Sequence, residues 1–340
     1  MSVQAQTAAA IVAASPGAAL LEVEGLRTQV RMRHGAFDVV DGVSFSVEHG
    51  EILGLVGESG CGKTMTALTL MRLLPVSVQV VGGRVLLDGR DLLGLSPSEM
   101  RQVRGKDVSM VFQEPMTSLD PAFTVGDQIV ETIRAHARVG KQQARARAAE
   151  ALERVGIPNA SRRIDDYPHQ FSGGMRQRVM LAIALVMEPK LVVADEPTTA
   201  LDVTIQAQIL ELIAELRREL GMSVILITHN LCVVHEIADR VAVMYAGEIV
   251  ETAPVREIFD DPKHPYTQGL LRSLPGLATR GSHLPVIPGR VPELTELPPA
   301  CRFAPRCPNR IARCDETHPD VKPIGPRHEL RCYNPTPFRR

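Results

Sequence analysis

The segment GESGCGKT, residues 57–64, decides how the rest of this chain is interpreted. It fits the phosphate-binding loop pattern G-x-x-x-x-G-K-[ST], in which glycines let successive backbone N–H groups turn toward phosphate oxygens. The preceding EILGLV (51–56) is typical of a strand, and the following MTALTLMRLLP (65–75) has helical periodicity and stops at Pro75. A loop between a strand and a helix N-terminus suits phosphate binding, so we predict a nucleotide site here.

The predicted nucleotide site contains the whole loop and the residue after it. Its residues are Gly57, Glu58, Ser59, Gly60, Cys61, Gly62, Lys63, Thr64 and Met65. Lys63 would reach the β- and γ-phosphates of a nucleotide, and the Thr64 hydroxyl would ligate Mg²⁺. The site is therefore expected to take ATP together with Mg²⁺.

A second element, LVVADEP (191–197), ends an apolar strand in two acids. Asp195 would hold the magnesium through water, and Glu196 would orient or deprotonate an attacking water. A strand that ends in two acids is often only a solvated turn. Its combination with a phosphate-binding loop favours the functional interpretation.

The order of the segments predicts an α/β fold. Strand-like stretches alternate with helical ones, which favours a largely parallel sheet covered on both faces. Residues 124–156 are helical throughout and are expected to belong to a subdomain inserted at about 114–188. We expect residues 1–19 to be a disordered extension, 20–255 the nucleotide-binding domain, and 256–340 an irregular C-terminal extension.

The composition excludes several classes of protein. Apolar residues make up 44% and charged residues 23% of the 340, which is ordinary for a globular protein. The net charge of −1 gives no general attraction to nucleic acid or acidic lipid. No apolar run approaches the ~20 residues that span a bilayer, and the alanine-rich N-terminus lacks the basic residues of a secretory signal.

Four further motifs occur along the chain. FSGGMRQR (171–178) resembles the signature motif of ATP-binding-cassette (ABC) ATPases, with Phe and Met where Leu and Gln are commonest. Gln113 in VFQEP resembles the Q-loop glutamine, ALD (200–202) the D-loop with Asp202, and His229 in LITHN the switch histidine. The resemblance covers roughly residues 21–250 and implies an ABC-type P-loop ATPase with a RecA-like core, an antiparallel β part and an inserted helical subdomain.

The resemblance also implies a mechanism. Two cassettes would pair head to tail, and the signature residues Ser172, Gly173, Gly174 and Met175 would serve the ATP of the partner subunit. Gln113 would sense Mg²⁺ and the attacking water, and His229 would hold the γ-phosphate. The family usually stacks an aromatic residue on adenine upstream of the loop, and the region before the loop offers Phe37, with His34 as the weaker candidate.

Two further segments resemble the ATPase subunits of bacterial peptide and nickel importers: VFQEPMTSLDP (111–121) and HPYTQGLLRSLP (264–275). This implies a peripheral protein on the cytoplasmic face of the bacterial inner membrane that hydrolyses ATP to drive uptake. Its partners would be two transmembrane permease subunits, an extracytoplasmic solute-binding protein and a second ABC ATPase, which is expected to be a different chain. The permeases would dock on residues 114–121 and on the inserted helices.

Other functions stay open. The ATPase subunits of dipeptide, oligopeptide, nickel-chelate and glutathione importers share these motifs, so the sequence does not separate these substrates. A cassette ATPase that acts on nucleic acid or ribosomes shares every nucleotide motif, and the tail from 301 to 340 has nine Lys and Arg against four Asp and Glu. Such chains usually carry a second cassette, a long coiled coil or a zinc insertion, which are absent here, so we expect no nucleic-acid partner.

The tail contains four of the six cysteines: Cys301, Cys307, Cys314 and Cys332. Disulfides are disfavoured in the reducing cytosol, and four free exposed thiols would be an oxidation liability. The spacing C-x5-C-x6-C-x17-C lacks the tight cysteine pairs of a zinc knuckle and is not that of a ferredoxin. The spacing alone therefore does not decide between a zinc site and an iron–sulfur cluster. The resemblance to importer ATPases, some of which have a [4Fe–4S] cluster on this extension, favours the cluster over Zn²⁺.

Overall fold

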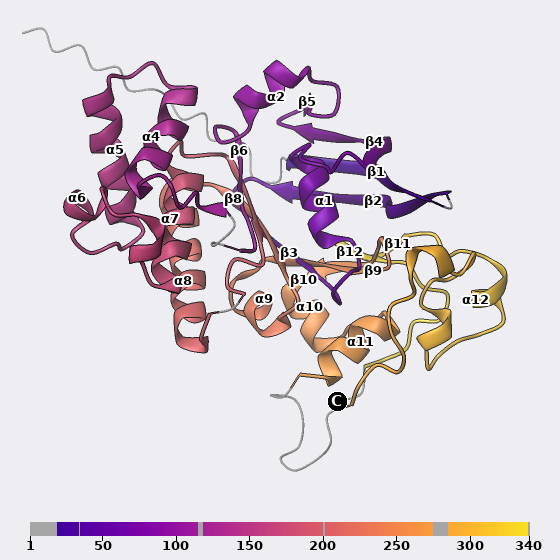
Figure 1. Cartoon of the computed structure of the whole chain (residues 1–340). Coiled ribbons are helices and arrows are strands. Elements are labelled where there is room, and N and C mark those ends of the chain that lie inside the picture. The colour runs from indigo at the N-terminus through magenta and orange to yellow at the C-terminus, as the bar shows by residue number, and fades with distance from the viewer. Residues whose placement is uncertain (1–18, 34, 115–117, 200, 275–284, 339–340) are drawn as a thin grey trace, which may run out of the picture.

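The computed structural model describes residues 19–33, 35–114, 118–199, 201–274 and 285–338. Within these residues the strands form two sheets (Figure 1). The smaller sheet is antiparallel, in the order β2-β1-β4-β5, and contains β1 (Ala19–Met32), β2 (Gly35–Glu48), β4 (Val78–Leu87) and β5 (Arg90–Asp91). The larger sheet has the order β11-β12-β10-β9-β3-β8-β7-β6.

The larger sheet forms the centre of the molecule. Its strands are β3 (Ile52–Val56), β6 (Val108–Val111), β7 (Leu191–Asp195), β8 (Ser223–Thr228), β9 (Arg240–Tyr245), β10 (Glu248–Pro254), β11 (Lys322–Gly325) and β12 (His328–Leu330). The strands from β9 to β6 pair in parallel, and the pairs that involve β10, β11 and β12 are antiparallel. The predicted α/β class, with an antiparallel part, is confirmed.

Both faces of the central strands are buried, as parallel strands require. In β7 the side chains of Leu191 and Val193 pack in one apolar cluster, which includes the antiparallel sheet and helix α1 (Lys63–Leu70). Val192 and Ala194 face the other way, into a cluster built mainly from the remaining helices. This alternation explains why the strand is a continuous apolar run in the sequence.

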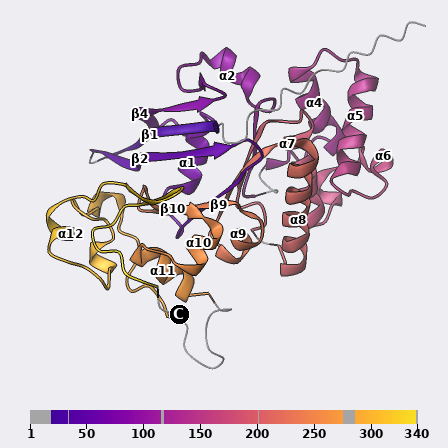
Figure 2. The same cartoon turned by 180° about the vertical axis from the view of Figure 1, so that it is seen from behind.

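The helices follow in the order that Figure 1 shows. They are α2 (Pro97–Val103), α4 (Val125–His136), α5 (Lys141–Arg154), α6 (Ala160–Arg163), α7 (Gly173–Leu185), α8 (Val203–Leu220), α9 (Leu231–Ile237), α10 (Val255–Asp260), α11 (Pro265–Arg272) and α12 (Arg313–Glu316). In both views α4 to α7 lie at one end of the molecule, and the C-terminal segment with α11 and α12 lies at the other (Figures 1 and 2). Among the described residues, no helix combines the length and the apolar character needed to cross a bilayer.

Two elements differ from the sequence-based expectations. Helix α1 was predicted to run to Pro75, but it ends at Leu70 because Arg72 takes a left-handed conformation with φ 50°. The C-terminal segment was expected to be irregular from residue 256, but it contains short helices and the hairpin β11–β12. Strand β12 pairs with β10, Glu251 opposite Leu330, so this segment extends the central sheet.

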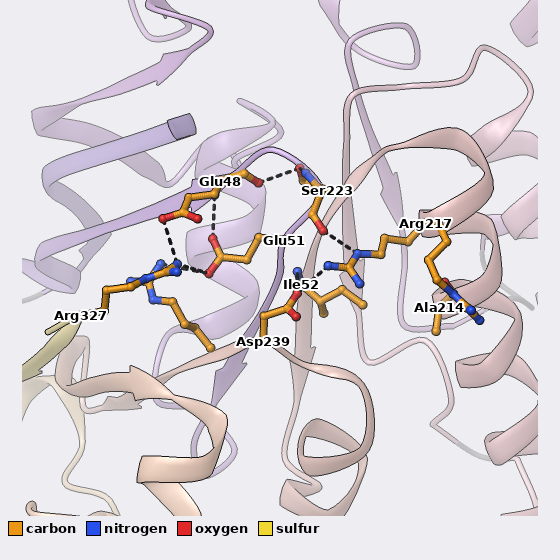
Figure 3. A network of polar contacts seen from close by, with 11 residues as sticks. Glu48, Glu51, Ile52, Ala214, Arg217, Ser223, Asp239 and Arg327 are labelled. Atoms are coloured by element: carbon orange, nitrogen blue, oxygen red, sulfur yellow. Dashed lines mark hydrogen bonds and ion pairs between the residues drawn. The ribbon is translucent and has the colours of Figure 1, made fainter. Parts of the chain in front are cut away.

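A polar network joins that hairpin to the turn between β2 and β3 (Figure 3). Arg327, in the turn between β11 and β12, lies 3.0 Å from carboxylate oxygens of both Glu48 and Glu51. Glu51 is buried and also accepts a hydrogen bond from Arg240 at 3.1 Å. The Ser223 hydroxyl donates to the backbone oxygen of Glu48 at 2.9 Å, which ties β8 to the same turn. The C-terminal segment is therefore an integral part of the nucleotide-binding fold.

Candidate functional site

The phosphate-binding loop connects β3 to α1 and depends on glycine for its shape. Gly60 and Gly62 have φ values of 79° and 109°, which L side chains rarely adopt. A Cβ on Gly57 would lie 2.2 Å from the backbone oxygen of Met244, and one on Gly62 would lie 2.8 Å from that of Val39. The loop therefore packs directly on β9 and β2, and side chains at these glycines would push it away from them.

Lys63 begins helix α1 and is almost fully buried inside the loop. Its ammonium group donates to the backbone oxygens of Gly57 at 2.8 Å and of Glu58 at 3.0 Å. Ser59, Gly60 and Thr64 are exposed, so the rim of the loop faces solvent. This places one positive charge within a loop whose rim is exposed at the N-terminus of α1, which suits a polyphosphate.

Cys61 is also buried in the loop. Burial raises the pKa of its thiol, so the side chain is uncharged at neutral pH. Met65 is half-buried and packs on the apolar cluster beneath α1.

Asp195 ends β7 beside the loop, as the sequence predicts. The Thr64 hydroxyl donates to its Oδ1 at 3.3 Å. Burial raises the pKa of Asp195, and the hydrogen bond from Thr64 opposes this only in part. Thr64, Asp195 and Gln113 line one open hollow. A hydroxyl, a carboxylate and an amide oxygen are hard donors of the kind that Mg²⁺ prefers, so these residues fit the predicted magnesium site.

Glu196 is the point where the predicted catalytic residues meet. Gln113 donates from Nε2 to its Oε2 at 3.0 Å, and Nδ1 of His229 lies 3.1 Å from its Oε1. Thr199, which the sequence interpretation missed, donates to Oε2 at 2.8 Å. Burial acts to raise the pKa of Glu196, but the hydrogen bonds from His229 and Thr199 outweigh it and hold the pKa below its ordinary value. Glu196 is thus a carboxylate at neutral pH.

The backbone of Glu196 is strained, with φ 46° for a non-glycine residue. Such strain persists only where the surroundings hold the residue in place, and here its N–H donates to the Ile227 oxygen at 2.9 Å. Asp195 and Glu196 therefore face different partners although they are adjacent in sequence.

The signature segment forms the start of helix α7. Ser172 is its N-cap, and the hydroxyl accepts a hydrogen bond from the Met175 N–H at 3.4 Å. Ser172 and Gly173 are exposed, so backbone N–H groups of this helix end face solvent. A Cβ on Gly174 would lie 2.7 Å from the Ile205 side chain of α8. The close approach of α7 and α8 therefore requires a glycine at position 174.

Asp202, predicted in the D-loop, caps helix α8. Its Oδ1 accepts from the Ile205 N–H at 2.9 Å. Phe37, the predicted adenine-stacking residue, is half-buried on β2 opposite Val30. Stacking by Phe37 stays a prediction, and His34 lies outside the described residues.

The four tail cysteines gather in one segment without a disulfide. The Cys301 N–H donates to the Cys314 oxygen at 3.1 Å. Burial, aided by the charges of neighbouring cysteines, raises the pKa of Cys307 to about 11 and of Cys332 to about 12. Across the described residues, no three or more His, Cys, Asp or Glu side chains form a group that could hold a metal ion. The metal centre predicted here stays a prediction.

The site can be compared with known proteins. Residues 40–199 match the family described as ABC transporter, and residues 250–314 match the oligopeptide/dipeptide transporter C-terminal region. A putative peptide import ATP-binding protein of Brucella abortus is 53% identical over 310 residues, which cover 91% of this chain and 93% of that protein. The dipeptide transport ATP-binding protein DppD of Bacillus subtilis is 50% identical, with 92% and 94% covered.

A solved structure has the same fold. The dimeric ATP-binding cassette MJ0796 in a post-hydrolysis state, bound to ADP and Pi, superimposes with a TM-score of 0.63 at 26% identity. The superposition covers 69% of this chain and 99% of that one.

Proposed function

This chain belongs to the ABC transporter family and is an ATPase, and we propose that its ATP hydrolysis drives the uptake of di- or oligopeptides through partner permeases. The C-terminal match to oligopeptide and dipeptide transporters supports the substrate class, as do the names of the Brucella and Bacillus relatives. The observation that carries the enzymatic part is the meeting of Gln113, Thr199 and His229 on the Glu196 carboxylate.

The residues around the loop divide the chemistry between them. Lys63 and the loop N–H groups would bind the β- and γ-phosphates of ATP. The ionised Glu196 would accept a hydrogen bond from the attacking water and align it with the γ-phosphorus, because its lowered pKa keeps the acceptor oxygens free of a proton. His229 would donate to the γ-phosphate oxygens as negative charge develops on them.

Thr64, Asp195 and Gln113 would hold the magnesium ion. Bound Mg²⁺ neutralises charge on the β- and γ-phosphates. Burial of Asp195 strengthens its interaction with a cation, since water screens a buried charge less than an exposed one.

The signature helix supports a head-to-tail pair of cassettes. Ser172, Gly173, Gly174 and Met175 present an exposed helix N-terminus, which suits the γ-phosphate of ATP on a partner subunit. The D-loop Asp202, beside this helix end, would lie in the same interface. We propose a second ABC ATPase, two transmembrane permeases and an extracytoplasmic solute-binding protein as partners, at the cytoplasmic face of the bacterial inner membrane.

We propose further that Cys301, Cys307, Cys314 and Cys332 bind a [4Fe–4S] cluster, with Zn²⁺ as the alternative. The support is the all-sulfur donor set in one segment and its proximity: the charges of Cys301 and Cys314 help to raise the pKa of Cys307, and those of Cys301, Cys307 and Cys314 help to raise that of Cys332. Anaerobic purification followed by iron, sulfide and zinc assays tests this. We expect four irons and four sulfides per chain. Stoichiometric zinc without iron would favour Zn²⁺ instead. The absence of both iron and zinc would refute a metal centre.

The proposed transport function is tested with the native complex. Co-purification should recover this chain with two permeases and a second ATPase, and mass spectrometry identifies them. In reconstituted vesicles, dipeptide uptake should require ATP and stop in a Glu196→Gln complex. Uptake of a nickel chelate without peptide uptake would contradict the proposed substrate class.

A further inference from the structure

The C-terminal segment reaches the phosphate-binding loop through Arg306. This arginine donates from Nη1 to Oε2 of Glu58 at 2.7 Å and from Nη2 to Oε1 at 3.0 Å. Glu58 is the second residue of the loop, 248 positions away in sequence. The Arg306 side chain is 5% exposed and the Glu58 side chain 31% exposed, so water reaches this two-pronged ion pair mainly from the Glu58 side.

Tyr266 holds the same residue from its backbone. Its hydroxyl oxygen accepts a hydrogen bond from the Glu58 N–H at 2.9 Å. Tyr266 is fully buried, with its ring 4.7 Å from that of Tyr245 and 5.4 Å from that of Phe303. Burial raises its pKa, so the phenol stays neutral, and the rings fix its position. Glu58 is thus held at both its side chain and its backbone.

A second connection runs through the turn between β9 and β10. Arg302 donates from Nη1 to the Ala246 oxygen at 2.6 Å and pairs with Glu248 at 3.4 Å. The next residue of that turn, Gly247, donates its N–H to the Cys61 oxygen at 2.8 Å. The segment between the first two tail cysteines therefore contacts the loop directly and supports the turn beneath it.

These contacts matter because the loop is conformationally costly. A loop with glycines at positive φ loses much chain entropy when it is ordered around a phosphate. Holding the loop in its binding shape beforehand removes part of this cost from the binding step. Neither Arg306 nor Tyr266 has a role in the ATPase mechanism given above, and both contacts are made to the same loop residue.

We propose that Arg306 and Tyr266 are positioning residues that hold the phosphate-binding loop in its nucleotide-binding shape, so that the C-terminal segment sets the affinity of the chain for ATP. The inference rests on the proposed ATPase function. It assigns the segment a role within this subunit, in addition to any metal that its cysteines bind.

The test compares matched variants of the full chain. The probe is a fluorescent N-methylanthraniloyl ATP with Mg²⁺, and phosphate release gives kcat and KM for ATP. Arg306→Gln should raise the Kd and KM about tenfold, which corresponds to the loss of a charge-assisted hydrogen-bonded pair, and should leave kcat within about twofold. Arg310→Gln is the control, because Arg310 lies in the same segment and pairs with Asp315 but is exposed.

Two further variants keep the proposal falsifiable if Arg306→Gln does not fold. Tyr266→Phe removes only the hydroxyl that accepts from Glu58 and should raise Kd by about three- to tenfold. The charge-swapped pair Glu58→Arg with Arg306→Glu should recover most of the affinity that either single change loses. Thermal unfolding of each variant shows whether the fold is retained.

The outcomes separate this inference from the ATPase assignment. One outcome is that the wild type hydrolyses ATP while Tyr266→Phe and the folded Arg306 variants bind ATP with the wild-type Kd. In that case the positioning role is wrong and the ATPase function stands. An equal loss in Arg310→Gln would also overturn it. If the wild-type chain does not hydrolyse ATP even in the complex with its permeases and second ATPase, the proposed function fails instead.

Discussion

Nδ1 of His229 lies 3.1 Å from Oε1 of Glu196, although 33 positions separate them in sequence. Each residue directly follows a strand, Glu196 after β7 and His229 after β8, and these two strands pair in parallel. The carboxyl ends of neighbouring parallel strands meet at one edge of the sheet, which brings the carboxylate and the imidazole together. Binding sites in open α/β sheets lie at this edge.

The first prediction concerns this imidazole. His229→Ala should lower kcat for ATP hydrolysis by about a hundredfold, because it removes a donor to the charge that develops on the γ-phosphate. Binding of the fluorescent ATP should change by less than about threefold, since Lys63 and the loop make the ground-state contacts. His49→Ala, which alters an exposed histidine paired with Asp88, is the control. A loss of affinity with unchanged kcat would contradict the assigned role.

The second prediction concerns the magnesium requirement. Asp195→Asn should raise the Mg²⁺ concentration for half-maximal phosphate release by about tenfold, because a charged donor becomes neutral. Without nucleotide the unfolding temperature of the variant should be no lower than that of the wild type, because burial disfavours the charged form of Asp195 and raises its pKa. Asp261→Asn, at an exposed pair with Lys263, should change neither value. An unaltered Mg²⁺ titration in Asp195→Asn would refute this ligand assignment.

The third prediction concerns the contact between the signature helix and α8. Gly174→Ala should lower the free energy of unfolding by about 1–3 kcal/mol, because its Cβ would lie 2.7 Å from the Ile205 side chain. Gly173→Ala is the matched control, as its Cβ would meet only Leu201 at 3.6 Å. Adding Ile205→Ala should reduce the penalty of Gly174→Ala, measured by urea unfolding. Equal penalties with and without Ile205 would show that the strain lies elsewhere.

The fourth prediction concerns pH and the C-terminal hairpin. His328 lies 3.0 Å from the buried Glu251 and 2.9 Å from Glu257. Burial acts to lower its pKa, but the hydrogen bonds that its ring N–H groups donate to Glu251 and Glu257 outweigh burial and raise the pKa above 6.5. A raised histidine pKa stabilises the fold fully below the unfolded value, and the contribution is lost as pH rises through the folded value.

The measurement for His328 is urea unfolding of the wild type and His328→Gln across a pH series. The difference in unfolding free energy should be largest at about pH 6 and should shrink as pH rises above the ordinary histidine pKa of about 6.5. A difference that grows with pH would mean that the histidine is neutral in the folded protein.

The residues that we propose to contact phosphate and water could be recognised in the sequence because their motifs are local. The loop at 57–64, the acid pair at the end of β7 and the motifs around Gln113 and His229 each need only a few neighbouring residues. Once a parallel sheet is inferred, the strand ends are expected to lie close together. In the structure Gln113 and His229 both contact Glu196, a meeting that the motifs alone did not predict.

The contacts of the C-terminal segment could not be predicted in this way. The pairing of Arg306 with Glu58 depends on how residues 248 positions apart pack, and no periodicity encodes such a distance. The hairpin of β9 and β10 was also missed, because its strands are short and are joined by a two-residue turn at Ala246 and Gly247. That turn is the link between Arg302 and the phosphate loop.

The measurement that tests the central claim most directly is phosphate release by the full chain and by Glu196→Gln at saturating Mg²⁺ and ATP. The amide has the size of the carboxylate and keeps an acceptor oxygen, but it cannot take a proton from water. The ATPase mechanism predicts that kcat falls by at least about a hundredfold while the Kd for the fluorescent ATP stays within about threefold. Hydrolysis by Glu196→Gln at the wild-type rate would contradict the assignment of Glu196 as the residue that activates water.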